Sequence, residues 1–301
     1  MQAHNRNQSD LEGKTMVITG ANGGIGFEAA LNFAQRGARV AMVCRDLSRG
    51  EKARSKVEQA SNNQNIRLYI ADFCKLDDAA RLAKQLSDTY PSIDVLCNNA
   101  GSVNRQQVIT SSGHEWTLTV NHLSGFLLTQ LLLPNLIEAG KTSLARIVFT
   151  SSTGHKHSAI DFNNLNLNGE YNILKAYSRS KLMNLLTAGE LNKRFKQHNI
   201  VASSFHPGVV DTGIWKYGGK WVDVMRVLAK PFILSAKQGA DTLIWLATSD
   251  DANSVNANGQ YFVKRKVAKT APFATDTAAQ QLWDVSFELL KTYLVENKDY
   301  A

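Results

Sequence analysis

The sequence predicts an α/β protein, built on one doubly wound parallel β-sheet with helices on both faces. Short, almost continuously apolar runs, such as Met16–Ile18 and Arg146–Ser151, alternate with amphipathic segments of helical period. Strands that are apolar on both faces indicate a sheet covered on both sides, and the alternation with helices indicates parallel connections. The chain has 301 residues, of which 44% are hydrophobic, so it can bury a full core. Since we find no repeats and no low-complexity linkers, we expect a disordered tail at 1–10 and a single domain at 11–301.

The elements follow one another in a regular order from Lys14 onward. Glycines and turn residues separate them, and the change between continuous apolar runs and helical period locates each one. We expect strands at 16–18, 39–44, 66–71, 94–97, 146–151, 200–205 and 260–263. We expect helices at 25–36, at 77–86, 116–133 and 236–247, around Tyr177, and a charged helix that follows the strand at 39–44 and continues through Ala60.

The composition limits the class of partner. The net charge is +8, from 34 Lys and Arg against 26 Asp and Glu, which would suit nucleic acid, a membrane surface or an anionic cofactor. The basic run Lys264-Arg265-Lys266 with Lys269 has no aromatic interleaving and no nucleic-acid motif beside it. It indicates a solvated edge, so we expect no nucleic-acid partner.

The cysteines and the N-terminus indicate a compartment. Cys44, Cys74 and Cys97 form no C-x-x-C pair, and each lies in or beside an apolar run, as reduced interior cysteines do. Residues 1–10 are polar, and no run approaches the roughly 18 apolar residues that a spanning helix needs. We therefore expect a cytoplasmic protein with no signal peptide and no transmembrane anchor.

A glycine-rich loop at Thr19–Gly26 falls between a predicted strand and a predicted helix. Glycines permit a tight turn and close backbone approach, and the following helix N-terminus offers free N–H groups to a pyrophosphate. The spacing Gly-x-x-x-Gly-x-Gly differs from the commoner Gly-x-Gly-x-x-Gly. In this strand–loop–helix context it predicts a Rossmann-type dinucleotide site.

Tyr177 and Lys181 stand four residues apart in a segment of helical period. That spacing puts the phenol and the ammonium on one helical face, one turn apart. A phenol with a pKa near 10 is a weak acid or base at neutral pH, and a nearby cation favours the phenolate and lowers that pKa. The pair suits proton transfer to or from a carbonyl or alcohol oxygen, although the same spacing is common on helix surfaces without any function.

Three motifs occur in a set order: Thr-Gly-x-x-x-Gly-Ile-Gly at 19–26, Asn-Asn-Ala-Gly at 98–101 and Tyr-x-x-x-Lys at 177–181. Together they resemble the short-chain dehydrogenase/reductase family, from about residue 11 to residue 262. Within it the sequence is most similar to the retinol dehydrogenase and WW-domain-containing oxidoreductase branch. The supporting stretches are 44–46, 120–123, 206–210 and 282–286. Many members of that branch carry a hydrophobic N-terminal anchor or a WW module, and we expect neither here.

The resemblance implies a catalytic tetrad. Ser152 would polarise the substrate oxygen, Tyr177 would be the acid/base, and Lys181 would lower the pKa of the tyrosine and bind the nicotinamide ribose. Asn121, in the helix expected at 116–133, would hold a water in the proton relay through Lys181. Ser151 is the rival of Ser152, but in such pairs the second serine usually fills the role.

The resemblance also implies a cofactor set and a loop. Asp72 resembles the aspartate that bonds the adenine amino group, and the residues from about 159 to 174 should form a loop beside the substrate cleft. The implied cofactor-binding residues are Gly20, Asn22, Gly24, Ile25, Gly26, Arg45, Asp72, Asn98, Ala100, Gly101, Tyr177, Lys181, Gly208, Val210 and Thr212.

The end of the second strand favours NADP over NAD. Enzymes that select NAD usually place Asp or Glu there, for the ribose 2′-hydroxyl. Here a neutral Cys44 is followed by Arg45, whose guanidinium can pair with a 2′-phosphate, and we expect Asp46 to turn away.

The function that we predict is an NADP(H)-dependent oxidoreductase acting on a small-molecule carbonyl/alcohol pair. Two tryptophans, a tyrosine and a methionine within 213–235 favour a lipophilic substrate such as a retinoid, a steroid or a lipid-derived carbonyl, and the lysines beside them suit transient contact with a membrane surface. The alternative is a catalytically idle dinucleotide-binding regulator. His155 and His157 have a spacing that metal sites use, but no further cluster supports it, so we expect no metal. A homo-oligomer is left open.

Overall fold

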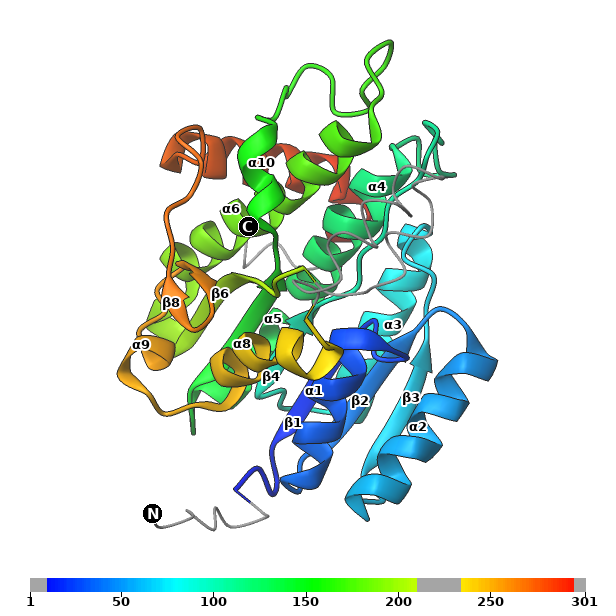
Figure 1. Ribbon diagram of the computed structural model, residues 1–301, viewed down its shortest axis with the longest axis vertical. Helices are drawn as coiled ribbons and strands as arrows, with labels where there is room; N and C mark the ends of the chain where they lie inside the picture. The colour runs from blue at the N-terminus through cyan, green and yellow to red at the C-terminus, as the bar shows by residue number, and fades with distance from the viewer. Residues whose placement is uncertain (1–9, 210–233, 295–301) are drawn as a thin grey trace.

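The architecture is described from a computed structural model, which covers residues 10–209 and 234–294. One sheet contains eight strands in the order β3-β2-β1-β4-β5-β6-β7-β8 (Figure 1). The first seven are mutually parallel and β8 is antiparallel to β7. The strands are β1 Thr15–Thr19, β2 Arg39–Cys44, β3 Ile66–Ile70, β4 Val95–Asn98, β5 Ala145–Thr150, β6 Ile200–His206, β7 Tyr261–Val263 and β8 Lys266–Val267.

The strand order reverses between β1 and β4. From β1 the chain builds outward through β2 and β3, and then returns to place β4 on the other side of β1. At such a switch point the connections leave in opposite directions, so a crevice opens at the carboxyl ends of the two strands. The glycine loop follows β1 and the 98–101 motif ends β4, so both border this crevice. The predicted doubly wound parallel sheet is confirmed.

Helices cover both faces of the sheet. Each face has its own hydrophobic cluster, with Phe33 and Trp245 in one and Phe126 and Trp283 in the other. The first face carries α1 Gly24–Gln35, α2 Leu47–Ser61 and α8 Ala236–Thr248, with α8 beside α1 (Figure 1). The second carries α3 Leu76–Thr89, α4 Trp116–Leu118, α5 Ser124–Gly140, α6 Ile173–Phe195, α10 Asp276–Leu289 and α11 Lys291–Leu294. Shorter pieces are the 3₁₀ turns Thr153–His157 and Lys196–His198 and the helix α9 Ala252–Val255.

The single helix predicted at 116–133 is in fact three pieces. A π-helical turn, η1 Thr119–Leu123, separates α4 from α5, and α5 continues to Gly140. Asn121 and His122 in this turn are buried and bond other parts of the chain: Asn121 donates to Ser180 in α6, and His122 pairs with Ser286 in α10. Because these partners are remote in sequence, apolar periodicity could not reveal the turn.

The C-terminal helices close the second face. Trp283 of α10 packs edge-on against Phe126 of α5, with ring centroids 5.0 Å apart. The Arg194 guanidinium from α6 lies 4.6 Å from the centroid of the Trp283 ring. We did not predict α10, α11 or β8. In the basic run, Lys264 and Arg265 form the turn into β8 and Lys266 begins that strand.

Helix α6 approaches the sheet without intervening side chains at one point. A Cβ placed on Gly259, just before β7, would lie 2.8 Å from the Cα of Gly189 in α6. Gly259 also has a φ of +77°, in the left-handed region that favours glycine. The backbones therefore set the distance between α6 and this corner of the sheet.

Candidate active site

The glycine loop forms a cradle at the end of β1. A Cβ on Gly26 would lie 2.3 Å from the carbonyl oxygen of Gly20, and Gly20 itself has a φ of +71°. The loop therefore needs glycine at both positions to close this tightly. Helix α1 begins at Gly24 without a side-chain cap, so its first N–H groups have no partner within the helix. These features fit the pyrophosphate of a dinucleotide.

The cradle is fixed to the end of β4 through Thr19 and Asn99. The Thr19 hydroxyl accepts the backbone N–H groups of Asn99 and Ala100 at 3.0 and 2.9 Å, and the Asn99 side-chain amide donates to the Thr19 carbonyl at 2.9 Å. Neither Thr19 nor Asn99 was among the predicted site residues. The predicted Asn98 points the other way: its buried side chain donates to Thr129 of α5 at 2.9 Å. A role of the Asn98 side chain in holding the cofactor does not fit this orientation.

Three predicted residues lie at the ends of β2 and β3. Arg45 is exposed immediately after β2. Asp46 turns away, as predicted, because its carboxylate accepts the N–H of Arg49 at 2.8 Å and caps α2. Asp72 follows β3, where its carboxylate accepts the N–H of Cys74 at 3.2 Å. Of these three side chains, Arg45 and Asp46 are exposed and Asp72 is half-buried, and Asp46 is engaged in capping α2.

Tyr177 and Lys181 lie one turn apart on α6, as the spacing predicts. The Lys181 ammonium is buried, donates to the carbonyl of Thr150 at 3.1 Å, and lies 5.6 Å from the centroid of the Tyr177 ring. Asn184, one turn further along α6, donates to the same Thr150 carbonyl at 3.1 Å. This carbonyl at the end of β5 therefore holds two side chains of α6.

Asn121, in η1, lies on the same side of Gly101 as the Lys181 ammonium. Its side-chain oxygen accepts the N–H of Ser102 at 2.8 Å, and its amide donates to the Ser180 hydroxyl at 3.0 Å. A Cβ on Gly101 would lie 3.2 Å from the Lys181 Nζ and 3.4 Å from the Asn121 Oδ1, so Gly101 leaves the room that both groups occupy. A π-helical turn at this position is consistent with a functional site.

The two adjacent serines at the end of β5 have different partners. The Ser151 hydroxyl is buried and donates to the backbone carbonyl of Lys181 at 2.7 Å. The Ser152 hydroxyl accepts the N–H of Gly154 at 3.1 Å and hydrogen-bonds the Tyr177 phenol. Ser152, and not Ser151, is therefore the serine beside the phenol.

Burial moves the pKa values of the tyrosine and the lysine in opposite directions. It raises the pKa of Tyr177, and the hydrogen bond from Ser152 opposes this rise only in part. Burial lowers the pKa of Lys181 to about 8. The sequence predicts a lowered pKa for Tyr177, whereas in the protein without cofactor loss of hydration is the larger contribution and raises it.

Two histidines, His155 after β5 and His206 at the end of β6, support the backbone that follows β5. The buried His155 ring donates from Nδ1 to the carbonyl of Ser152 at 2.6 Å, and its Nε2 accepts the N–H of Ala271 at 3.2 Å. The His155 ring also packs edge-on against Tyr261, with centroids 4.8 Å apart. His206 accepts the N–H of Thr153 at 3.4 Å, and burial lowers the pKa of His206 to about 4. We did not predict His155 as a support of the site, and its tautomer is fixed by these two bonds.

Some predicted positions cannot be placed. Val210 and Thr212, and the part of the predicted 213–235 substrate segment that ends at residue 233, lie outside the described residues. Gly208 is described: it has a φ of +88° and lies against Leu234. Within residues 10–209 and 234–294, no helix is long and apolar enough to cross a membrane.

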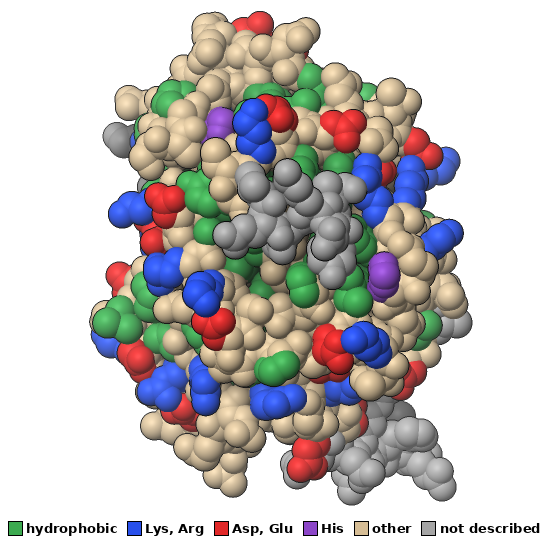
Figure 2. Space-filling view, turned by 180° about the vertical axis from the view of Figure 1, so that it is seen from behind, with side chains coloured by type: hydrophobic (Ala, Val, Ile, Leu, Met, Phe, Trp, Pro, Cys, Tyr) green, Lys and Arg blue, Asp and Glu red, His purple; other side chains and the backbone are tan. Residues whose placement is uncertain are grey.

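The surface has no single charged face on the side shown in Figure 2. Hydrophobic side chains gather near the middle of this side, and basic and acidic side chains are spread together around them. The net charge of +8 is therefore not concentrated into one patch here.

Comparison with known proteins identifies the family. The model described as short chain dehydrogenase matches residues 14–223. A protein described as a daunorubicin C-13 ketoreductase, from Streptomyces sp. (strain C5), is 37% identical, and the match covers 94% of both chains. Human retinol dehydrogenase 11 is also 37% identical, over 93% of this chain and 86% of its own. The WW domain-containing oxidoreductase of Gallus gallus is 34% identical, over 95% of this chain and 70% of its own.

A solved structure agrees with the sequence comparison. An uncharacterised protein from Mycobacterium paratuberculosis superposes with a TM-score of 0.74 at 30% identity, covering 95% of this chain and 96% of that one. The fold, the order of the motifs and these relatives lead to one conclusion: the chain belongs to the short-chain dehydrogenase/reductase family, in its retinol dehydrogenase-like branch.

Proposed function

We propose that this protein is an NADP(H)-dependent oxidoreductase that interconverts a lipophilic aldehyde or ketone and its alcohol. Membership of the family gives the coarser statement, an oxidoreductase of alcohols and carbonyls that uses a nicotinamide dinucleotide. The observation that carries the proposal is the convergence of Ser152, Tyr177, Lys181 and Asn121, from three separate elements, beside the glycine cradle.

The proton chemistry falls to the side chains of this chain. The bound nicotinamide supplies or accepts the hydride. In carbonyl reduction the Tyr177 phenol gives its proton to the substrate oxygen, which the Ser152 hydroxyl polarises by hydrogen bonding. In alcohol oxidation the same two groups work in reverse.

Lys181 and Asn121 support that proton transfer. The Lys181 ammonium favours the phenolate that Tyr177 becomes after giving up its proton, and it would hold the ribose hydroxyls of the cofactor. Asn121, held by Ser102 and Ser180, would fix a water that returns a proton through Lys181. Burial of these groups strengthens each interaction, because the surrounding dielectric constant is low.

Arg45 supports a preference for NADP. Asp46 is the carboxylate nearest to the end of β2 in the sequence, and it is already engaged in capping α2. The exposed Arg45 guanidinium can therefore meet a 2′-phosphate without competition from Asp46.

Three observations support a lipophilic substrate. Leu174 lies one helical turn before Tyr177 and is 70% exposed, and Val209, just after Gly208, is 44% exposed. The sequence between 213 and 221 adds Trp215, Tyr217 and Trp221. The names of the relatives refer to retinol, an apolar polyene alcohol, and to the C-13 ketone of daunorubicin, a large polycyclic molecule.

The experiment that tests the proposal is turnover of NADPH with a panel of aldehydes and ketones. Tyr177→Phe removes the acid/base but keeps the ring, so we expect loss of turnover with NADPH binding retained. A phenylalanine variant with near wild-type kcat on a confirmed substrate would falsify the assignment. A protein that binds NADPH but turns over no carbonyl would support the alternative, a catalytically idle regulator.

Substrate class is tested within the same assay by a homologous series of aldehydes. A lipophilic site predicts that kcat/KM rises with chain length, because each buried CH₂ contributes about 0.8 kcal/mol. A kcat/KM that stays flat or falls as the chain lengthens would reject this part of the proposal and leave the oxidoreductase assignment standing.

A further inference from the structure

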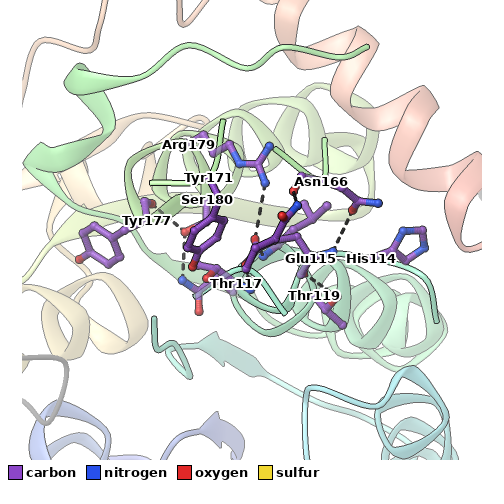
Figure 3. A network of polar contacts seen from close by, with 12 residues as sticks. His114, Glu115, Thr117, Thr119, Asn166, Tyr171, Tyr177, Arg179 and Ser180 are labelled. Carbon is purple, nitrogen blue, oxygen red and sulfur yellow. Dashed lines mark hydrogen bonds and ion pairs between the residues drawn. The ribbon is translucent and has the colours of Figure 1, made fainter. Parts of the chain in front are cut away.

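A fully buried ion pair lies beside the tetrad. Arg179 and Glu115 have exposed side-chain fractions of 1% and 0%, and the Arg179 Nη2 lies 3.5 Å from the Glu115 Oε2. In Figure 3 the Arg179 side chain points from α6 toward Glu115. None of the predicted chemistry uses this pair.

The pair joins the two elements that carry the tetrad. Arg179 stands on α6 between Tyr177 and Lys181. Glu115 caps α4, because its two carboxylate oxygens accept the N–H groups of Thr117 and Leu118 at 2.7 and 2.9 Å. Helix α4 runs directly into η1, which carries Asn121. The Glu115–Arg179 pair is thus a second cross-link between these elements, next to the bond from Asn121 to Ser180.

The same pair also holds the loop 158–172, which precedes α6. Arg179 Nη1 donates to the carbonyl of Asn164 at 3.3 Å. The backbone N–H of Glu115 donates to the Asn166 side-chain oxygen at 2.8 Å, and the Asn166 amide donates to Gly113 at 3.0 Å. The loop is therefore tied both to α6 and to the segment that leads into α4.

Burying this ion pair costs hydration free energy, so we expect the pair to serve a purpose other than stability. Two charges withdrawn from water lose several kcal/mol of hydration each, and apolar side chains of similar volume often stabilise a fold equally well. Apolar side chains, however, make no directional contacts, whereas hydrogen bonds and ion pairs do. A guanidinium that contacts both Glu115 and Asn164 fixes the rotation and the height of α6 relative to α4 and the loop.

We propose that Arg179 and Glu115 are positioning residues for the tetrad. They hold Asn121 in register with Tyr177 and Lys181, and they keep loop 158–172 as a fixed wall beside Tyr177. The expected effects on kcat rest on the proposed function, and the expected effects on hydrogen exchange rest on geometry alone.

The experiment compares three variants at the pair with one matched control. Arg179→Met leaves Glu115 buried and unpaired, Arg179→Lys keeps the charge without the fork, and Glu115→Gln combined with Arg179→Met removes both charges. The control is Arg146→Met. Arg146 is also buried, at 6% exposed, but it bonds the carbonyls of Leu246 and Ser249 near the amino end of β5, away from the tetrad.

The kinetic result separates positioning from stability. We expect Arg179→Met to lower kcat by about tenfold or more, as displacements below 1 Å can do, with KM for NADPH within about twofold. Arg179→Lys should recover part of that kcat. The double variant should regain part of the lost thermal stability, because no unpaired charge remains and one of the two oxygens that cap α4 is kept, while its kcat stays low. Arg146→Met should lower Tm without lowering kcat. If the double variant regains kcat together with Tm, the role is structural only and the proposal is wrong.

A second readout does not depend on turnover. Hydrogen exchange of the unliganded protein should be faster in 116–123 and 158–172 in Arg179→Met, and unchanged there in Arg146→Met. Unchanged exchange in Arg179→Met overturns the proposal, even if no carbonyl substrate is ever found. If exchange is faster in Arg179→Met but the wild type turns over no carbonyl, the structural role of the Glu115–Arg179 pair stands and the proposed function is rejected.

Discussion

Lys181 is buried deeply enough that its ammonium group loses its proton only slightly above physiological pH. Burial lowers the pKa of Lys181 to about 8, so the ammonium form prevails below pH 8 and the neutral amine above it. If the ammonium is the form that assists Tyr177, kcat/KM for carbonyl reduction should be level below about pH 7 and fall above pH 8, about tenfold per pH unit.

This pH profile has a direct check. Lys181→Arg carries a guanidinium that stays charged throughout, so any activity that it retains should lack the fall above pH 8. Circular dichroism over the same range would show that the protein remains folded. A wild-type profile that is level up to pH 10 contradicts the role of the ammonium.

Arg45 gives the second prediction at this scale. Removing the guanidinium in Arg45→Ala should reduce the preference for NADPH over NADH by roughly 1.5–3 kcal/mol, the range for hydrogen bonds to charged groups. The measurement is kcat/KM with each cofactor. Lys56→Ala is a suitable control, since it removes one exposed positive charge further along α2. Equal kcat/KM values for both cofactors in the wild type would refute the assignment.

At the scale of the elements, η1 and α10 are joined by a buried histidine. His122 pairs with the Ser286 hydroxyl at 2.8 Å, and burial lowers the pKa of His122 to about 3. Below pH 6.5 the unfolded chain takes up a proton at His122 that the native state does not. The free energy of unfolding should therefore fall as the pH falls from 6.5 toward 3, by about 1.4 kcal/mol per pH unit.

The prediction concerns the difference between two proteins. Between pH 7 and pH 5 the wild type should lose roughly 2 kcal/mol more than His122→Gln does, as measured by urea unfolding. Taking the difference removes the contributions of His155 and His206, whose pKa values burial also lowers and which both proteins share. Parallel losses in the two proteins would show that His122 can take up a proton without opening η1.

The elements differ in how far the sequence predicts them. The parallel strands were predicted to within about two residues, because a strand covered on both faces is continuously apolar. The turn η1 and the pair Glu115–Arg179 depend on contacts between remote residues, which one sequence does not display. Asn98 and Asn99 show the finer limit. Successive residues at a strand end point to opposite sides of the sheet. The predicted residue Asn98 therefore faces α5, and its neighbour Asn99 faces the crevice and contacts Thr19.

At the scale of the whole molecule, the two hydrophobic clusters are parts of one unit. They lie on opposite faces of the same sheet, and neighbouring residues such as Val17 and Ile18 of β1 contribute to different clusters. Neither cluster can lose its strands without exposing the other. We therefore propose that residues 11–301 form one domain that unfolds cooperatively.

This proposal predicts a single thermal transition. Calorimetry, far-ultraviolet circular dichroism and tryptophan fluorescence should give the same midpoint, since Trp245 and Trp283 belong to different clusters. Two resolved transitions, or a fluorescence midpoint separated from the calorimetric one, would show that the faces melt independently. Binding of NADPH should raise the shared midpoint as a whole.

The contact between Gly189 and Gly259 should make the site sensitive to substitution of Gly259, which lies outside it. A methyl group on Gly259 would lie 2.8 Å from the Cα of Gly189, and a backbone atom of α6 cannot turn aside as a flexible side chain can. Gly189 lies eight residues beyond Lys181 on that helix, roughly 12 Å at 1.5 Å per residue. A displacement of α6 at Gly189 would also shift Lys181 on the same helix. Gly259→Ala should therefore lower turnover, although Gly259 is not among the predicted site residues.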